Sequence, residues 1–289
     1  LFSLFLLLQS ALGGGQHDQA SLGSLGKLWN AAEALSQNRS AIPPSPLDTG
    51  GDAGSMTDPQ AKEAPKVKGI YVTAHSAGGA RMASLLELVD KTELNAMVID
   101  IKDDNGFITY KTDNAALTKW GTPQPYIRNV DGLVSTLREH KIYPIARIVV
   151  FKDTVLAKKH PELSFRNPDG TVWKNGKGDS FVNPYVKDVW EYNVAIAKEA
   201  AKLGFKEIQF DYVRFPEGFE KKADHLKFTK TEESRVDVVA GFVKYARQQL
   251  EPLGVRVSVD IFGYAASVPA AEGIGQDFVK ISEAGNVIC

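Results

Sequence analysis

Four charged side chains lie near the carboxyl ends of successive predicted strands: Asp100, Arg147, Asp211 and Asp260. Neighbouring strands lie about 4.8 Å apart, so Asp211 and Asp260 are expected to face each other across roughly 5 Å. Two carboxyls about that far apart suit cleavage of a glycosidic bond with retention, in which one is the nucleophile and the other the proton donor. The residue types and spacing therefore predict Asp211 and Asp260 as a catalytic pair.

The proton donor of such a pair must stay protonated near neutral pH, which requires an apolar surrounding or a nearby like charge. Phe262 and Tyr264 are candidates for the apolar wall, and an ionised Asp211 would supply the charge. Three cations are candidates to keep Asp211 ionised: Lys102, Arg147 and Arg214. The competing interpretation is that each carboxylate is only a helix cap or part of a loop salt bridge. Because carboxylates recur at corresponding ends of successive strands, we favour a catalytic or binding site over that interpretation.

The segment 152–184 is long for a loop between a strand and a helix, and such loops often shape a substrate groove. Pro168-Asp169-Gly170 indicates a turn, and Thr171–Lys174 followed by Asn175-Gly176 predicts a small hairpin. Candidate aromatic platforms for a sugar are Trp173, Phe181, Tyr185, Tyr212 and Phe215. The predicted substrate-binding set is Asp100, Lys102, Asp103, Arg147, Tyr212, Arg214, Trp173 and Phe262.

Composition and motifs exclude several other classes. The 34 Lys and Arg residues balance 35 Asp and Glu, so the basic surplus of a nucleic-acid-binding protein is absent. Cys289 is the single cysteine and the five histidines are scattered, which excludes Cys/His zinc spacing. The run 100–106 resembles a calcium loop, but its spacing is wrong and Lys111 takes the place of the bidentate Glu. We predict no cofactor and no metal site, with bound calcium left open.

From Val67 onward, short apolar strands alternate with amphipathic helices. The expected strands cover 69–73, 95–101, 143–151, 207–215, 255–262 and 287–288, and the expected helices cover 81–91, 130–140, 187–203, 236–250 and 277–284. Such alternation predicts an α/β fold with a parallel sheet, either open and doubly wound or closed as a barrel. Charged residues at successive strand ends favour a (β/α)8 TIM-type barrel, of which five to six strands are present.

Two segments precede this domain, which we place at 66–289. Residues 1–13, LFSLFLLLQSALG, are apolar but too short to cross a bilayer, and they match the centre of a signal peptide. A membrane-anchor fragment is the alternative. Residues 14–65 are rich in Gly, Ser, Ala, Gln and Pro, which is typical of a low-complexity linker. We expect an exported protein, either secreted or tethered to the cell envelope.

Five ordered strings resemble a family of glycoside hydrolase domains, exported bacterial TIM barrels long catalogued as a domain of unknown function: KGIYVTAHSAGG, LNAMVIDIKDDNGFITY, IYPIARIVVFKD, FVNPYVKDVWEYNVAIAKEAAKLGFKEIQFDYVRFP and VSVDIFGYAAS. The family is more distantly similar to amylase-type barrels. By position, that similarity implies that Asp211 is the nucleophile at the end of the fourth strand. It likewise implies that Asp260 is the acid/base at the end of the fifth, where the amylase-type residue is normally Glu.

The same resemblance implies closing strands beyond Cys289. We therefore expect the chain as given to be poorly soluble and inactive alone, and the complete protein to be a monomer acting on an extracellular or cell-wall polysaccharide. Two rivals remain open: a barrel that binds glycan without cutting it, and a carbohydrate deacetylase or lyase, which the histidine placement disfavours. The sugar, its linkage and retention against inversion also stay open.

Overall fold

The computed structural model describes residues 65–289, so the predicted signal segment 1–13 and the linker up to residue 64 lie outside the described residues. Six strands pair in parallel and follow chain order across the sheet: β1 (Gly69–Val72), β2 (Ala96–Lys102), β5 (Tyr143–Val149), β6 (Glu207–Asp211), β7 (Arg256–Val259) and β8 (Val287–Ile288). Within 65–289, β1 pairs only with β2 and β8 only with β7, so the barrel is not closed. The predicted α/β class and six parallel strands are confirmed.

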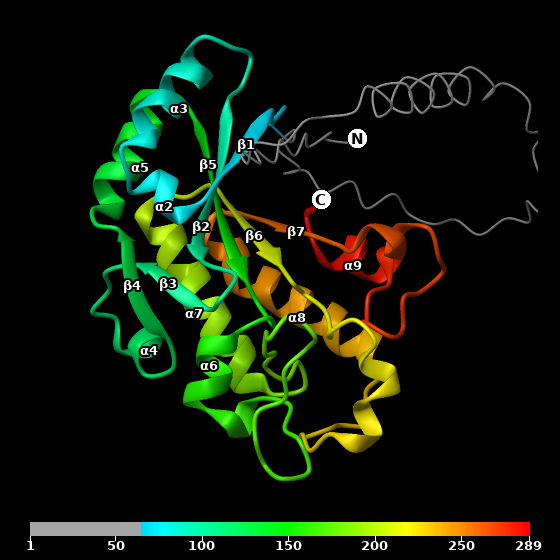
Figure 1. The fold of residues 1–289 in the computed structure, drawn as a ribbon. Coiled ribbons are helices and arrows are strands. Elements are labelled where there is room, and N and C mark those ends of the chain that lie inside the picture. Colours follow the sequence, from blue (N-terminus) through cyan, green and yellow to red (C-terminus); the bar gives the residue numbers. More distant parts are fainter. Residues whose placement is uncertain (1–64) are drawn as a thin grey trace, which may run out of the picture. The chain divides into compact units, whose positions relative to one another are not determined.

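The five expected helices are present as α3, α5, α7, α8 and α9, and the long helices α7 and α8 pack on one face of the sheet (Figure 1). The short helices α2, α4 and α6 were not predicted. The bounds of the helices are α2 (Ala74–Ala77), α3 (Arg81–Asp90), α4 (Ala115–Thr118), α5 (Val130–Glu139), α6 (Thr154–Lys159), α7 (Lys187–Leu203), α8 (Arg235–Leu250) and α9 (Phe278–Ala284). Helix α7 ends at Leu203 and is capped by Gly204, whose φ of 110° favours glycine. Ser234 caps α8 by accepting a hydrogen bond from the backbone N–H of Asp237.

A short arm beside β2 was not predicted. After β2 the chain turns through Asp103–Gly106 into β3 (Phe107–Tyr110), which pairs antiparallel with β2, and β4 (Thr122–Ile127) extends the arm. Asp103 stabilises the turn, because its Oδ1 accepts the backbone N–H groups of Asn105, Gly106 and Phe107. Asn105-Gly106 is a common turn pair and could have predicted this hairpin.

The two faces of the sheet bury different kinds of side chain. The outer face packs under the helices in one large apolar core, which includes Ile99, Ile148 and Phe210. The inner face carries only a small apolar cluster of Ala96, Val98 and Ile145 near the start of the strands. Polar side chains occupy the rest of that face on β6 and β7, as the alternation of these strands predicted.

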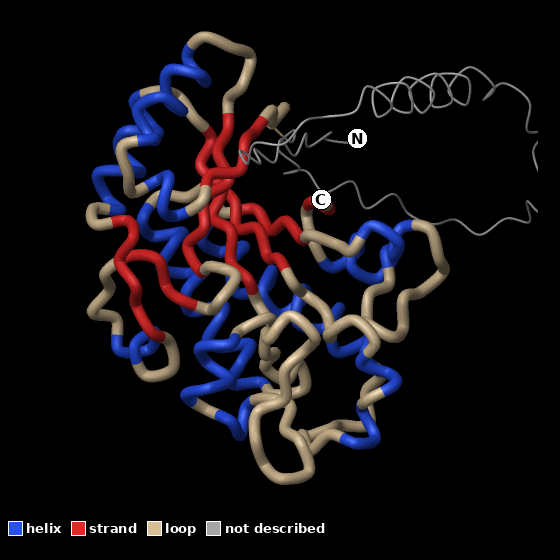
Figure 2. Tube along the Cα trace, in the orientation of Figure 1, coloured by secondary structure: helices blue, strands red, loops and turns tan. Residues whose placement is uncertain are grey.

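The end of β6 and the long loop after β5 differ from the prediction. Strand β6 ends at Asp211 instead of Phe215, because Tyr212 adopts a left-handed backbone conformation with φ of 51°. In the long loop after β5, an antiparallel bridge joins Arg166 to Val172 across the Pro168–Gly170 turn. The chain also turns after Lys174 as predicted, because the backbone N–H of Asn175 donates to the carbonyl oxygen of Asp179 over 2.9 Å, but Val172 pairs with the preceding segment and not across Asn175-Gly176. The loops after β5 and β6 gather beyond the carboxyl ends of the strands, at the lower side of Figure 2.

Candidate active site

Five successive parallel strands each place one polar side chain near the carboxyl end on the inner face: Tyr71, Asp100, Arg147, Asp211 and Asp260. Asp100 on β2 pairs in register with Arg147 on β5. Asp211 lies two residues beyond Gln209, the register partner of Arg147 on β6. The order of the strands thus brings together side chains that are up to 189 positions apart in the sequence (260 − 71).

Asp211 and Asp260 occupy adjacent positions on β6 and at the end of β7. Phe210 pairs with Val259, and the backbone N–H of Asp260 donates to the carbonyl oxygen of Phe210 over 3.0 Å. The next pair along these strands is therefore Asp211 and Asp260, about one strand spacing apart. The structure brings the two predicted carboxyls together on one face, which is the arrangement that a two-carboxylate mechanism needs.

Arg147 lies at the centre of the site and contacts three carboxylates. Its Nε and Nη2 donate to Oδ2 of Asp211 over 2.9 and 2.6 Å, and its Nη1 donates to Oδ1 of Asp100 over 2.7 Å. Looser contacts of 3.3 and 3.5 Å join it to Asp104. Burial alone would lower the pKa of Arg147, but the charges of Asp211, Asp100 and Asp104 outweigh it and raise that pKa. Arg147 is therefore a permanent cation that holds Asp211.

Asp260 has the opposite environment. Although it keeps some contact with solvent, protein atoms surround most of its carboxyl, and this burial is the largest cause that raises its pKa to about 8. The charge of Asp211 raises it further, while Arg147 opposes the change. A carboxyl with that pKa is protonated at neutral pH, whereas its neighbour Asp211 is ion-paired. The two members of the pair thus differ in the way that an acid and a nucleophile differ.

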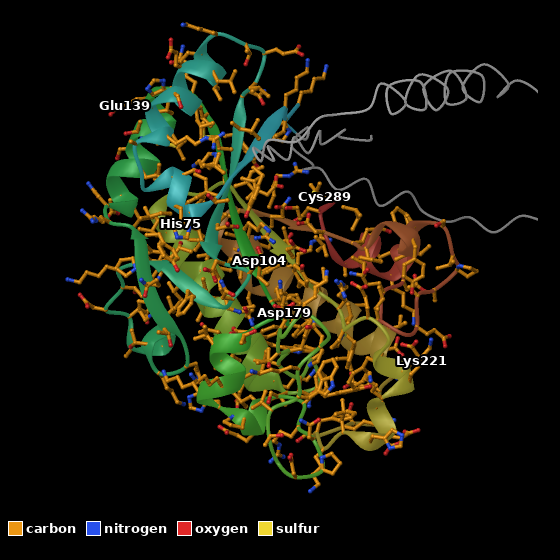
Figure 3. All side chains as sticks on the ribbon, viewed as in Figure 1. His75, Asp104, Glu139, Asp179, Lys221 and Cys289 are labelled. Atoms are coloured by element: carbon orange, nitrogen blue, oxygen red, sulfur yellow. The ribbon has the colours of Figure 1, made fainter. Side chains whose placement is uncertain are left out.

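Two site residues escaped the sequence analysis. The hydroxyl of Tyr71 donates to Oδ2 of Asp100 over 2.6 Å, and its ring lies 5.4 Å from the guanidinium carbon of Arg147. Asp104 lies between Arg147 and Lys152, whose Nζ is 3.5 Å from Asp104 Oδ1. Figure 3 labels Asp104 at the strand ends, close to Asp179, which is 3.9 Å from the same Lys152. Alternation along β1 could have indicated Tyr71, but nothing local marked Asp104 apart from Asp103.

The structure contradicts the predicted role of Lys102. A bulge shifts the register of β2 between Asp100 and Lys102, so Lys102 does not lie on the face that carries Asp100. Lys102 is fully buried, where its Nζ lies 2.6 Å from Oδ2 of Asp153 and donates to Asn193 and to the carbonyl oxygen of Val149. The prediction that Lys102 contacts a sugar or holds Asp211 is therefore wrong. Asp103 uses one carboxylate oxygen to accept the backbone hydrogen bonds of the turn. Its neighbour Asp104 is the residue that faces Arg147.

The predicted aromatic platforms separate into buried and exposed groups. Trp173, Phe181, Tyr185 and Phe215 are buried, and the interpretation of these four rings as open sugar platforms is wrong. Tyr212 and Phe262 are accessible, and the guanidinium of Arg214 lies between them, 5.0 Å from each ring centroid. Arg214 donates to Glu217 and to the carbonyl oxygen of Phe215, so Arg147 is the cation that contacts Asp211. Tyr212, Arg214 and Phe262 thus form a ridge beside the acid pair.

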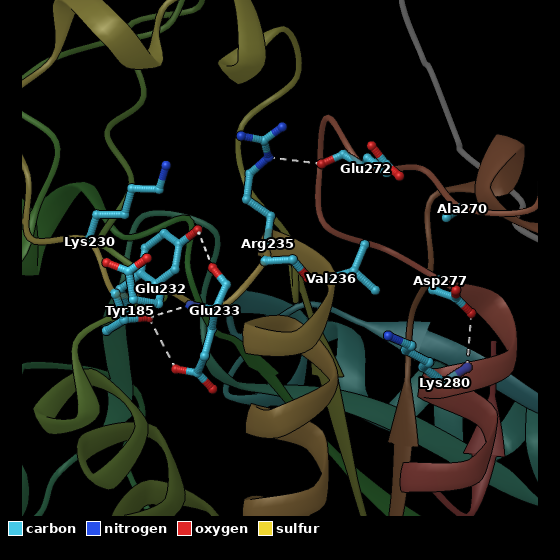
Figure 4. A pocket seen from close by; sticks show the side chains of 12 residues that line it. Tyr185, Lys230, Glu232, Glu233, Arg235, Val236, Ala270, Glu272, Asp277 and Lys280 are labelled. Carbon is cyan, nitrogen blue, oxygen red and sulfur yellow. Dashed lines mark hydrogen bonds between the residues drawn. The ribbon is translucent and has the colours of Figure 1, made fainter.

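Other features of the described domain lie away from this chemistry. A cavity of about 650 Å³ lies at the start of α8 and between the loops, where Tyr185 donates to the carbonyl oxygen of Glu233 and Arg235 to that of Glu272 (Figure 4). Neither Asp211 nor Asp260 lines this cavity. The candidate active site is therefore the group of side chains at the strand ends and not this cavity. In residues 65–289, no cluster of three or more His, Cys, Asp or Glu side chains is arranged to hold a metal ion. No helix of the described part is long and apolar enough to cross a bilayer.

Comparison with known proteins adds a family and a fold. A family model described as "Putative glycosyl hydrolase domain" matches residues 69–289. A crystal structure of a hypothetical protein from Ruminiclostridium thermocellum ATCC 27405 is 37% identical with a TM-score of 0.61, over 67% of this chain and 98% of that chain. An α-amylase from Lactobacillus plantarum is 15% identical with a TM-score of 0.52, over 76% of this chain. This chain spans 51% of that α-amylase, and at that identity the likeness shows the fold alone. No curated protein matches the sequence.

Proposed function

The chain belongs to the glycosyl hydrolase domain family whose model spans residues 69–289, and from this premise we propose that it hydrolyses glycosidic bonds with Asp211 as nucleophile and Asp260 as acid/base. One observation carries the assignment of roles. Arg147 pairs with Asp211, while burial and the charge of Asp211 raise the pKa of Asp260 to about 8. Asp260 thus keeps its proton at neutral pH, whereas its neighbour Asp211 is paired with the guanidinium of Arg147.

The proposed reaction proceeds in two displacements. Asp211 attacks the anomeric carbon and forms a glycosyl ester, while Asp260 gives its proton to the departing glycosidic oxygen. Asp260, now ionised, takes a proton from water, and that water displaces Asp211 from the sugar. Since Asp211 and Asp260 are opposite each other on adjacent strands, their separation favours retention over inversion. The hydrolysis rate is expected to fall as the pH rises through about 8, because Asp260 then loses the proton that it must donate.

Substrate contacts are proposed for the side chains that surround the pair. Asp104 is half-buried beside Arg147, and Tyr212 and Phe262 are accessible on either side of Arg214. Carboxylates accept hydrogen bonds from sugar hydroxyls, and aromatic faces pack on the apolar faces of sugar rings. We propose an extracellular or cell-wall polysaccharide as the substrate. The basis for that part is the signal-like segment 1–13.

The test uses a panel of 4-nitrophenyl and 2,4-dinitrophenyl glycosides with the full-length protein and two variants of it. Asp211→Asn should abolish turnover of every glycoside. Asp260→Asn should slow 4-nitrophenyl glycosides by about 10²–10⁴-fold and 2,4-dinitrophenyl glycosides far less in the first step, since that leaving group needs no proton. Added azide should restore turnover of Asp260→Asn and yield a glycosyl azide.

The matched control is Asp237→Asn, which removes an exposed carboxylate paired with Lys280 and should leave rates unchanged. Equal losses in Asp260→Asn on both leaving groups, without azide rescue, would contradict the acid/base role. Glycan binding without cleavage by the unchanged protein would instead favour a barrel that only binds carbohydrate. Proton NMR of the first product reports the anomer and hence retention.

A further inference from the structure

Tyr71 on β1 reaches the site from the opposite side to Asp260. Its register partner on β2 is Val98, and its hydroxyl donates to Asp100, two residues further along that strand. About two fifths of the Tyr71 surface is exposed, whereas Asp100 is almost fully buried, with 4% of its surface exposed. The half-exposed Tyr71 therefore donates its hydroxyl to a buried carboxylate that has few other hydrogen-bond donors around it.

The contacts of Asp100 form one continuous chain across four strands. Tyr71 donates to Oδ2 of Asp100, and Arg147 Nη1 donates to Oδ1 of the same carboxylate. Through Nε and Nη2, Arg147 then holds Oδ2 of Asp211. Each oxygen of Asp100 is thus used once, by one donor on each side. A shift of Asp100 would move Arg147, and Arg147 contacts the proposed nucleophile.

The buried carboxylate needs both donors. Burial raises the pKa of Asp100, while Arg147 and the hydrogen bond from Tyr71 act against this change. Asp104 is the other charged group that acts on Asp100, and its charge favours protonation. A protonated Asp100 would no longer attract the guanidinium of Arg147. The hydroxyl of Tyr71 thus supports both the orientation and the charge of Asp100.

We propose that Tyr71 is a positioning residue, whose hydroxyl orients the carboxylate of Asp211 through Asp100 and Arg147. The hydrogen-bonded chain does not depend on the activity, but its role in catalysis rests on the proposed function of Asp211. Tyr71 is not a second acid, because burial and Asp100 raise the pKa of its hydroxyl well above the ordinary value.

The first test measures the chain of contacts without a substrate. In ¹H–¹⁵N spectra of the protein, the Nε–H of Arg147, assigned by its loss in Arg147→Lys, should exchange slowly with solvent because it donates to Asp211. Tyr71→Phe keeps the ring over Arg147 and removes only the hydroxyl. We expect this variant to raise the exchange rate of the Arg147 Nε–H by about tenfold, the low end for loss of a hydrogen bond to a charged group.

Tyr143→Phe is the matched control. Tyr143 lies on the same face near the start of β5, four positions before Arg147, and its hydroxyl donates to Glu207 over 3.3 Å. This variant loses an equivalent tyrosine–carboxylate contact and should leave the Arg147 signal unchanged. An unchanged exchange rate in Tyr71→Phe, or an equal increase in Tyr143→Phe, would overturn the proposal. If Tyr71→Phe fails to fold, Asp100→Asn tests the next link with the same expected result and the same refutation.

The second test connects position to catalysis. On a 2,4-dinitrophenyl glycoside that the protein cleaves, Tyr71→Phe should lower kcat about tenfold with little change in KM, because Asp211 acts on the reacting carbon and not in ground-state binding. Raised KM with unchanged kcat would make Tyr71 a substrate contact and contradict the positioning role. If the full-length protein cleaves no glycoside, the proposed function fails, and the exchange rate alone still decides whether Tyr71 holds Arg147.

Discussion

Removal of the charge on Asp211 should lower the pKa of Asp260. The two residues lie on adjacent strands, whose backbones are about 5 Å apart, and two unit charges at that separation would interact by about 3 kcal/mol at an effective dielectric constant near 20. That energy corresponds to about 2 in pKa. Since the pKa of Asp260 is raised to about 8, Asp211→Asn should bring it to about 6. Arg147, no longer shared with a carboxylate at position 211, should assist the decrease.

The assay is a ¹³C NMR titration of protein labelled at the aspartate carboxyl carbons, in which loss of one signal in Asp260→Asn identifies that carboxyl. Asp237→Asn is the control, because its carboxylate is exposed and paired with Lys280, so the Asp260 titration should not move. If Asp211→Asn leaves the pKa of Asp260 near 8, the charge of Asp211 does not reach Asp260. The reasoning that the two side chains converge would then be refuted.

Three further predictions concern stability. Lys102→Met leaves the carboxylate of Asp153 buried without its cation and should lower the free energy of unfolding by about 3–5 kcal/mol in urea titrations. As a control, Lys91→Met breaks the exposed pair with Glu87 and should lower it by less than about 1 kcal/mol. Similar losses in both variants would contradict a buried ion pair. Gly106→Ala should lower the unfolding temperature, because the φ of 101° is strained for alanine and its Cβ would lie 1.9 Å from Oδ1 of Asp153; an unchanged temperature would show that the turn relaxes freely. Asp260→Asn should gain stability relative to the unchanged protein as pH rises from about 4 to about 8, because a carboxyl whose folded pKa is raised stabilises the fold only while protonated. The measurement is the unfolding temperature of both proteins in thermal scans. If the difference between the two temperatures stays constant across this pH range, the raised pKa is contradicted.

Much of the fold was predictable because it depends on local periodicity. Runs of Val, Ile and Phe predicted the parallel strands, and helix α7 covers Lys187–Leu203, the range that the sequence predicted. Alternation along β6 and β7 placed Asp211 and Asp260 on the same face, and the register confirmed that placement. The predicted catalytic roles of the two residues remain predictions, since placement on a common face does not measure reactivity.

The sequence by itself determined the six parallel strands, their order and the face on which most strand-end charges lie, because these follow from side-chain alternation and from short-range turns. Only the tertiary structure decided which charges meet. The bulge in β2 turned Lys102 away from the site into a buried pair with Asp153, and the register of three strands brought Arg147 between Asp100 and Asp211. Bulges and inter-strand register depend on contacts between residues far apart in the chain, which no local pattern records.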